Sequence, residues 1–81
     1  METRVAVISI IVERKEAVSE LNRLLSEHGD YIIGRMGLPY KKKGINIISV
    51  AIDAPMNTIN ALTGSLGRLD GIQAKVAYSS L

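Results

Sequence analysis

The order of the apolar segments is the feature that most constrains how this chain of 81 residues can fold. Three segments resemble strands because aliphatic residues, most of them β-branched, dominate them, and a fourth alternates apolar and polar residues with a period of two. Two further segments repeat their apolar residues at helical spacing. In chain order, the expected elements are a strand over residues 4–12, a helix over 13–29, strands over 31–38 and 45–53, a helix that begins between residues 53 and 57, and a strand over 72–78.

This βαββαβ order predicts an α+β fold of the ferredoxin-like type. We expect a two-layer sandwich, with an antiparallel four-stranded sheet and both helices on one face of it. The length allows one hydrophobic core, so residues 1–81 are predicted to form a single domain. Because these elements use nearly every residue, little of the chain is left to build an active site.

Glycine and proline residues suggest where several of these elements end. Gly29 is placed to end the first helix in left-handed geometry, and Pro39 is placed to end the second strand. Pro55 fits the first turn of the second helix, where no amide hydrogen bond is lost. The apolar stripe of the second helix is expected to contain Met56, Ile59, Leu62 and Leu66.

The first and third strand segments are apolar on both of their faces. Helices can cover one side of such a sheet, so the other side needs a second cover. The second helix has no charged residue between Asp53 and Arg68, which is unusual for a solvated helix. We therefore expect self-association into homodimers or homotetramers. The predicted contact residues are Val5, Val7, Ile11, Ile45, Ile47, Asn57, Asn60 and Gly64.

The residue types that carry most enzyme chemistry are scarce. There is no cysteine, and His28 is the one histidine, so a single subunit offers too few nitrogen and sulfur donors for a transition-metal site. The acidic residues form no tight motif with a nucleophile or a base. We therefore predict no catalytic residue, no metal, no cofactor and no enzyme activity. His28 is expected to pack and cap at the end of the first helix, while a metal site shared between copies of His28 in an oligomer stays open.

Lys41, Lys42 and Lys43 are expected to form the tip of a hairpin between the second and third strands. This basic tip is either a solvated turn or a patch that meets an acidic partner or a phosphate backbone. Tyr40 beside it could stack on a base, but the chain lacks the aromatic pair that RNA-recognition sheets use. Nucleic-acid binding by this domain alone is therefore the weaker interpretation.

The chain shows no sign of membrane insertion or export. The apolar run from Val5 to Val12 is too short to span a bilayer, and it lacks a signal-peptide cleavage pattern. The formal net charge of +2 implies no general attraction to a membrane surface. We expect a cytoplasmic protein with no membrane partner.

Three stretches of sequence carry a resemblance to a known family. They are VISIIVERKEAVSELNRLL (residues 7–25), GDYIIGRMGLPYKKKGINIISVAIDAP (29–55) and INALTGSLGRLDGIQAKVAYS (59–79). Together they resemble the small family named for regulation of the iron-only hydrogenase system. That family is ACT-like and similar to the regulatory half of the nickel-responsive repressor, which implies a ferredoxin-like fold that assembles side by side into dimers or tetramers.

The resemblance also shows what this chain lacks. Nickel-responsive repressors bind metal through several histidines and a cysteine, which one histidine cannot replace. The sequence carries no ribbon-helix-helix segment before the first strand, so no direct DNA binding is expected and an effect on transcription would need a partner protein. ACT-like modules bind small effectors near the loop after the first strand, but residues 12–15 lack the glycine or aspartate used there. A ligand is expected instead near Arg35, Gly37 and Tyr40.

These observations lead to one functional hypothesis and one alternative. The hypothesis is a non-catalytic, ACT-like regulatory domain that acts as a homo-oligomer and binds a small effector at a subunit interface. The alternative is an adaptor that binds an acidic protein partner through Lys41, Lys42 and Lys43.

Overall fold

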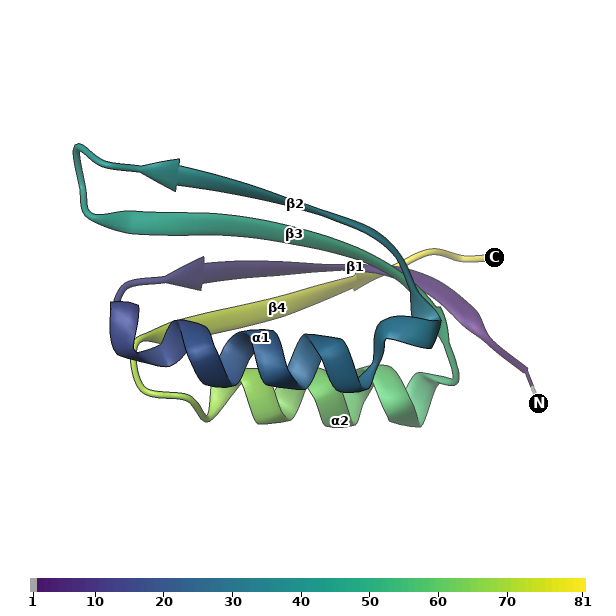
Figure 1. Ribbon diagram of the computed structural model, residues 1–81. Coiled ribbons are helices and arrows are strands. Elements are labelled where there is room, and N and C mark those ends of the chain that lie inside the picture. Colours follow the sequence, from purple (N-terminus) through teal and green to yellow (C-terminus); the bar gives the residue numbers. More distant parts are fainter. Residues whose placement is uncertain (1) are drawn as a thin grey trace.

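The computed structural model describes residues 2–81 and shows the expected order of elements (Figure 1). The strands are β1 (Arg4–Val12), β2 (Ile32–Tyr40), β3 (Ile45–Ala54) and β4 (Ile72–Tyr78). The helices are α1 (Val18–Glu27) and α2 (Met56–Gly67), and short 3-10 turns at Lys15–Ala17 and Gly29–Tyr31 flank α1. The ferredoxin-like α+β fold predicted from the sequence is confirmed.

The four strands form one antiparallel sheet in the order β2-β3-β1-β4. This order makes β1 and β3 the central strands and leaves β2 and β4 at the edges. Both helices lie on the same face of the sheet, and the β2–β3 hairpin rises away from the helix layer (Figure 1). In residues 2–81, no helix lies against the other face of the sheet, as the sequence predicted.

The core fills the space between the helices and the sheet. Alternate residues of the central strands point into it, and Ile8, Val50 and Ile52 are fully buried. From the helices, the buried aliphatic residues are Leu21, Leu25, Ile59, Leu62 and Leu66. Burying one such side chain contributes about 1.5–3 kcal/mol, so this set provides most of the energy that holds the two layers together.

Several predicted element ends were wrong. Gly29 does not adopt left-handed geometry: it begins a 3-10 turn, and in residues 2–81 positive φ occurs only at Gly44 and Gly71. Helix α1 begins at Val18 instead of residue 13, because the backbone at Arg14 is extended and no side chain caps the start.

Strand β2 continues through Pro39 instead of ending before it, and Pro39 pairs with Asn46 of β3. An edge strand tolerates proline because an N–H that faces solvent makes no bond in the sheet. The predicted core position of Met56 was also wrong, since it is 44% exposed at the start of α2 while Pro55 beside it is buried.

Candidate functional site

The helix-free side of the sheet carries apolar side chains on both sides of the Ser9–Ser49 pair, and we call these side chains the free sheet face. They are Val5, Val7 and Ile11 of β1, Met36, Leu38 and Tyr40 of β2, and Ile45 and Ile47 of β3. All but the half-buried Ile45 are exposed, by 37% to 68% of their surface. Five of the eight contact residues predicted from the sequence lie on this face.

Strand register explains why these side chains are neighbours. Leu38 pairs with Ile47, and Ile47 pairs with Ile11, so these three residues form one row across β2, β3 and β1. Paired residues in adjacent antiparallel strands point to the same side of the sheet. The charged residues that the register places on this side, Lys75 and Asp53, lie towards its margins.

The other three predicted contact residues lie on a different surface, the outer side of α2. Asn57 and Asn60 are exposed there, and Gly64 is half-buried. Asn60 accepts a hydrogen bond from the Tyr78 hydroxyl, and a Cβ added at Gly64 would lie 3.6 Å from the Arg68 guanidinium. The structure therefore divides the predicted contact residues between two surfaces that do not meet.

The three predicted ligand residues are also divided, in this case between the two faces of the sheet. Arg35 and Gly37 pair with the buried residues Val50 and Ile48, so they face the helix side. Tyr40 pairs with Ile45 and lies on the free sheet face. Arg35 and Gly37 line the same groove beside α1, and Tyr40 does not.

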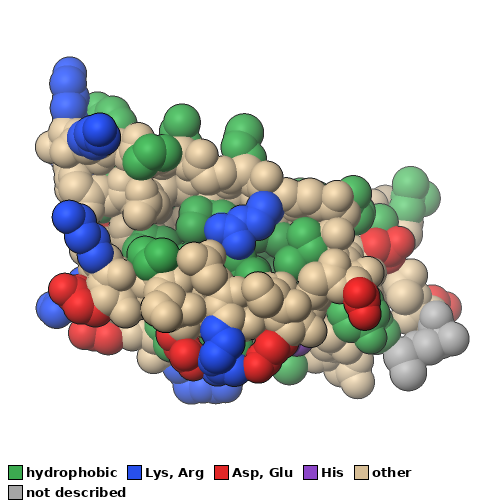
Figure 2. Space-filling model, in the orientation of Figure 1, with side chains coloured by type: hydrophobic (Ala, Val, Ile, Leu, Met, Phe, Trp, Pro, Cys, Tyr) green, Lys and Arg blue, Asp and Glu red, His purple; other side chains and the backbone are tan. Residues whose placement is uncertain are grey.

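Lys41, Lys42 and Lys43 occupy the predicted turn between β2 and β3, and all three are exposed. The turn is closed by the Lys43 amide, which donates to the Tyr40 carbonyl, and by Gly44 in left-handed geometry. Among residues 2–81, no carboxylate forms an ion pair with any of these lysines. Figure 2 shows basic side chains gathered at this end of the hairpin.

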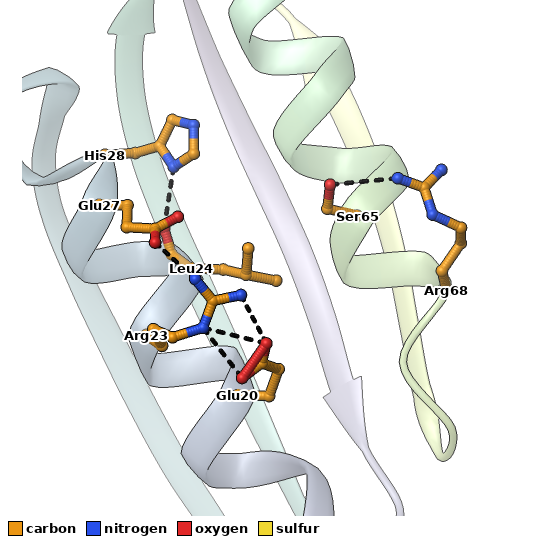
Figure 3. A network of polar contacts seen from close by, with 7 residues as sticks. All are labelled: Glu20, Arg23, Leu24, Glu27, His28, Ser65 and Arg68. Atoms are coloured by element: carbon orange, nitrogen blue, oxygen red, sulfur yellow. Dashed lines mark hydrogen bonds and ion pairs between the residues drawn. The ribbon is translucent and has the colours of Figure 1, made fainter.

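The ion pairs of α1 fall on its solvent side (Figure 3). Arg23 contacts Glu20 and Glu27, each with an N–O distance of 2.5 Å. The hydrogen bond from Arg23 lowers the pKa of Glu20, while partial loss of water opposes this shift and the positive charge of Arg23 adds to it. The two carboxylates in turn raise the pKa of Arg23 above its ordinary value.

His28 ends α1, and its Nδ1 lies 2.8 Å from the Leu24 carbonyl oxygen (Figure 3). This contact satisfies one of the last carbonyls of the helix, which is the capping position predicted from the sequence. Within the described residues, no three His, Cys, Asp or Glu side chains gather in a way that could hold a metal ion. In residues 2–81, no helix has the length and hydropathy needed to cross a membrane.

Sequence reasoning missed the contribution of β2 to the free sheet face. Met36 and Leu38 are among its most exposed members, at 68% and 60%. The period-two spacing of Met36, Leu38 and Tyr40 is present in the sequence. Gly37 and Pro39 lie between these residues, and because both types are unfavourable inside a strand they obscure the pattern.

The architecture defines this chain as a ferredoxin-like domain with an uncovered apolar sheet face. A family model described as "TM1266-like: Iron-only hydrogenase system regulator, putative" matches residues 4–76. The chain belongs to this family of iron-only hydrogenase system regulators, which confirms the resemblance seen in the sequence.

A solved structure of the uncharacterized protein TM1266 from Thermotoga maritima is similar along its whole length. The two share 31% sequence identity with a TM-score of 0.91, over 95% of this chain and 98% of that one. The search of curated proteins finds no match to this chain.

More distant structures share the fold alone. A formyltetrahydrofolate deformylase from Pseudomonas putida is 13% identical, with a TM-score of 0.65 over 90% of this chain and 28% of that one. A homoserine dehydrogenase from Thiobacillus denitrificans is 17% identical, with a TM-score of 0.64 over 94% of this chain and 17% of that one. In both cases this chain corresponds to a small part of a larger protein.

Proposed function

We propose that this chain is a non-catalytic, ACT-like regulatory module of the iron-only hydrogenase system, and that it acts in the cytoplasm as a homo-oligomer. The regulatory class comes from the family. The observation that carries the rest is the free sheet face, where seven large apolar side chains are exposed on β1, β2 and β3. A group of exposed apolar side chains on one face is typical of protein contact sites.

A second copy of this chain is the occupant that we propose for this face. The face is nearly free of charge, with Lys75 and Asp53 towards its margins, so two copies can meet without burying like charges. Central strands supply Val7 and Ile47, whose positions are fixed by strand pairing on both sides. The contact surface is therefore rigid before assembly, which lowers the entropic cost of association.

Sedimentation equilibrium of the full chain, with an Ile47→Lys variant, tests this proposal. We expect the native chain to be a dimer or tetramer at micromolar concentration and the variant to be a monomer, because the charge would have to be buried without a partner. Met56→Lys is the matched control: Met56 is 44% exposed and Ile47 43%, but Met56 lies on α2. A native monomer, or an oligomer that only Met56→Lys disrupts, would contradict the proposal.

The effector-binding part of the hypothesis places a small molecule at the interface between copies. Tyr40 lies on the free sheet face, beside Ile45, and would be at that interface. Assembly and effector binding are then coupled, and an effector that binds only the assembled form makes the oligomer more stable. A thermal-shift screen with metals, amino acids and nucleotides, repeated with Ile47→Lys, would detect such a ligand as a shift present only in the native chain.

The alternative function is an adaptor that binds an acidic protein. It is favoured by the three exposed lysines at the tip of a hairpin that rises away from the helix layer (Figure 1). Replacing Lys41, Lys42 and Lys43 by glutamate would abolish capture of an acidic partner while leaving the oligomer intact. Unchanged capture would remove this alternative.

A further inference from the structure

A groove runs along the helix side of the sheet where α1 stops short of the edge strand β2. Its volume is about 280 Å³. The residues that line it are Val18, Leu21 and Asn22 of α1, Arg35, Gly37, Leu38 and Pro39 of β2, and Asn46 and Ile48 of β3. Figure 2 shows the corresponding hollow, with hydrophobic side chains inside it, between the hairpin and the helix layer.

Arg35 is the one charged residue in this lining. Its guanidinium donates a hydrogen bond to Oδ1 of Asn22, at 3.3 Å, and no carboxylate in residues 2–81 lies within ion-pair distance of it. Arginine has five N–H donors in a planar fork that matches a carboxylate. One neutral contact leaves most of these donors available, and the side chain is already held across the groove by Asn22.

Gly37 leaves space at the centre of the groove. It pairs with the buried Ile48, so a side chain at this position would point to the helix side, and a Cβ there would meet no atom within 4 Å. Beside this space, the half-buried Val18 provides apolar surface, and the buried Leu21 and Ile48 lie next to it. The volume is just below the range of about 300–1,000 Å³ typical of pockets for drug-sized ligands, so the groove suits a smaller molecule.

We propose that this groove binds a small monocarboxylate with a short, branched apolar tail. The carboxylate pairs with Arg35 and the side-chain amides of Asn22 and Asn46, and the tail lies in the space above Gly37. The lining contains no acidic residue to pair with an ammonium group, so an acid without an amino group fits better than the corresponding amino acid. This inference does not rest on the proposed function, because the groove and the free sheet face lie on opposite sides of the sheet.

The test uses 4-methylpentanoate as the probe, titrated into the full ¹⁵N-labelled chain and followed by NMR. We expect saturable shifts of the Gly37 and Asn46 amides and of the Arg35 side-chain N–H. The neutral isostere 4-methylpentanamide should bind about tenfold more weakly, since a charge-assisted hydrogen bond contributes roughly that factor. Leucine should also bind more weakly, because its ammonium group would lie at the groove without an acidic partner in the lining. Equal affinity for the acid and the amide would overturn the proposal, as would the absence of saturable shifts at about 10 mM acid.

Two variants and two controls locate the site. Arg35→Gln should lower affinity about tenfold, whereas Arg68→Gln should leave it unchanged, because Arg68 also has one neutral side-chain partner, Ser65, but lies outside the groove (Figure 3). Gly37→Val should fill the groove and abolish binding without lowering the melting temperature. Full affinity in Arg35→Gln would overturn the proposal. Ile47→Lys should bind normally, which separates failure of this site from failure of self-association.

Discussion

The two faces of the sheet both carry large aliphatic side chains but differ in what covers them. Ile10 and Ile11 are neighbours in β1 and point to opposite sides. Ile10 is 1% exposed beneath the helices, whereas Ile11 is 37% exposed on the free sheet face. Burial in this fold therefore depends on the position of the helices and not on the apolar character of the residues.

This difference indicates that the two faces meet different requirements. The covered face has to be apolar for the subunit to fold, because its side chains form the core. The free sheet face has no such role within one copy, and polar residues there would serve a monomer equally well. Its apolar character is accounted for if a second copy covers it.

The largest expected difference in the free energy of unfolding is the one between Ile10→Ala and Ile11→Ala. The first removes a buried side chain and leaves a cavity, which should lower the free energy of unfolding by about 2–5 kcal/mol. The second should cost less than about 1 kcal/mol in dilute protein, as exposed positions usually do. Urea denaturation of both variants measures the difference.

The free energy of unfolding of the same two variants can also be measured at several protein concentrations. If copies meet through the free sheet face, the effect of Ile11→Ala should grow with concentration, because assembly stabilises the native chain by mass action. If both variants lost the same free energy of unfolding in dilute protein, the two faces would contribute equally to the stability of one copy. The distinction between a covered and an uncovered face would then be wrong.

The next largest change in stability is expected from a comparison of two turns, one between α2 and β4 and one at the hairpin tip. Gly71 and Gly44 both have positive φ, at 82° and 66°. A Cβ at Gly71 would lie 2.5 Å from Cγ of Arg14, while a Cβ at Gly44 would meet nothing within 4 Å. Gly71→Ala should therefore cost about 2–3 kcal/mol and Gly44→Ala about 1 kcal/mol. Thermal unfolding of the two variants measures the gap, and equal melting temperatures would refute it.

A smaller change in the free energy of unfolding, of opposite sign, is expected at Gly37. This residue lies on the helix side of the sheet, beyond the part that α1 covers. Glycine within a strand is unfavourable, and a valine here has space for its side chain. Gly37→Val should raise the free energy of unfolding by about 0.5–1 kcal/mol, as measured in urea. A loss of stability would show that α1 covers this position after all.

The smallest effect concerns the solvent side of α1. Because the pKa of Glu20 is lowered from its ordinary value of 4.5 in the folded chain, its contact with Arg23 adds stability above that value. The contribution is lost as the pH falls through the lowered pKa. Glu20→Gln should be slightly less stable than the native chain near neutral pH and equally stable in strong acid. A difference that persists at low pH would argue against the Glu20–Arg23 contact as its cause.

The sequence predicted the fold well where local patterns decide it. The bounds of β1 and β4 agree because each is a run of strand-forming residues with a clear end. The passage of β2 through Pro39 depends on its place at the sheet edge, which is a property of the assembled sheet. The start of α1 was set too early because its apolar stripe continues backwards into a 3-10 turn.

The candidate site was harder to predict because it depends on register. A register shift between Ile32 and Gly34 determines which residues of β2 face the helices. From Gly34 to Tyr40 the strand then alternates without a break, so Arg35 and Gly37 face the helices and Tyr40 faces the other side. Residues that are close in sequence therefore belong to different surfaces. Contact residues on β1 and β3 were simpler to assign, because alternation in an unbroken strand decides their face.

Pro39 has a consequence for how large an assembly can become. An unprotected sheet rim can recruit further strands without limit, which is how many proteins aggregate. In β2 the proline offers no amide for such a bond, and the irregularity near Gly34 distorts the other end of the same rim. Growth by edge-to-edge strand addition is therefore discouraged along β2, whereas stacking of sheets can close after a fixed number of copies.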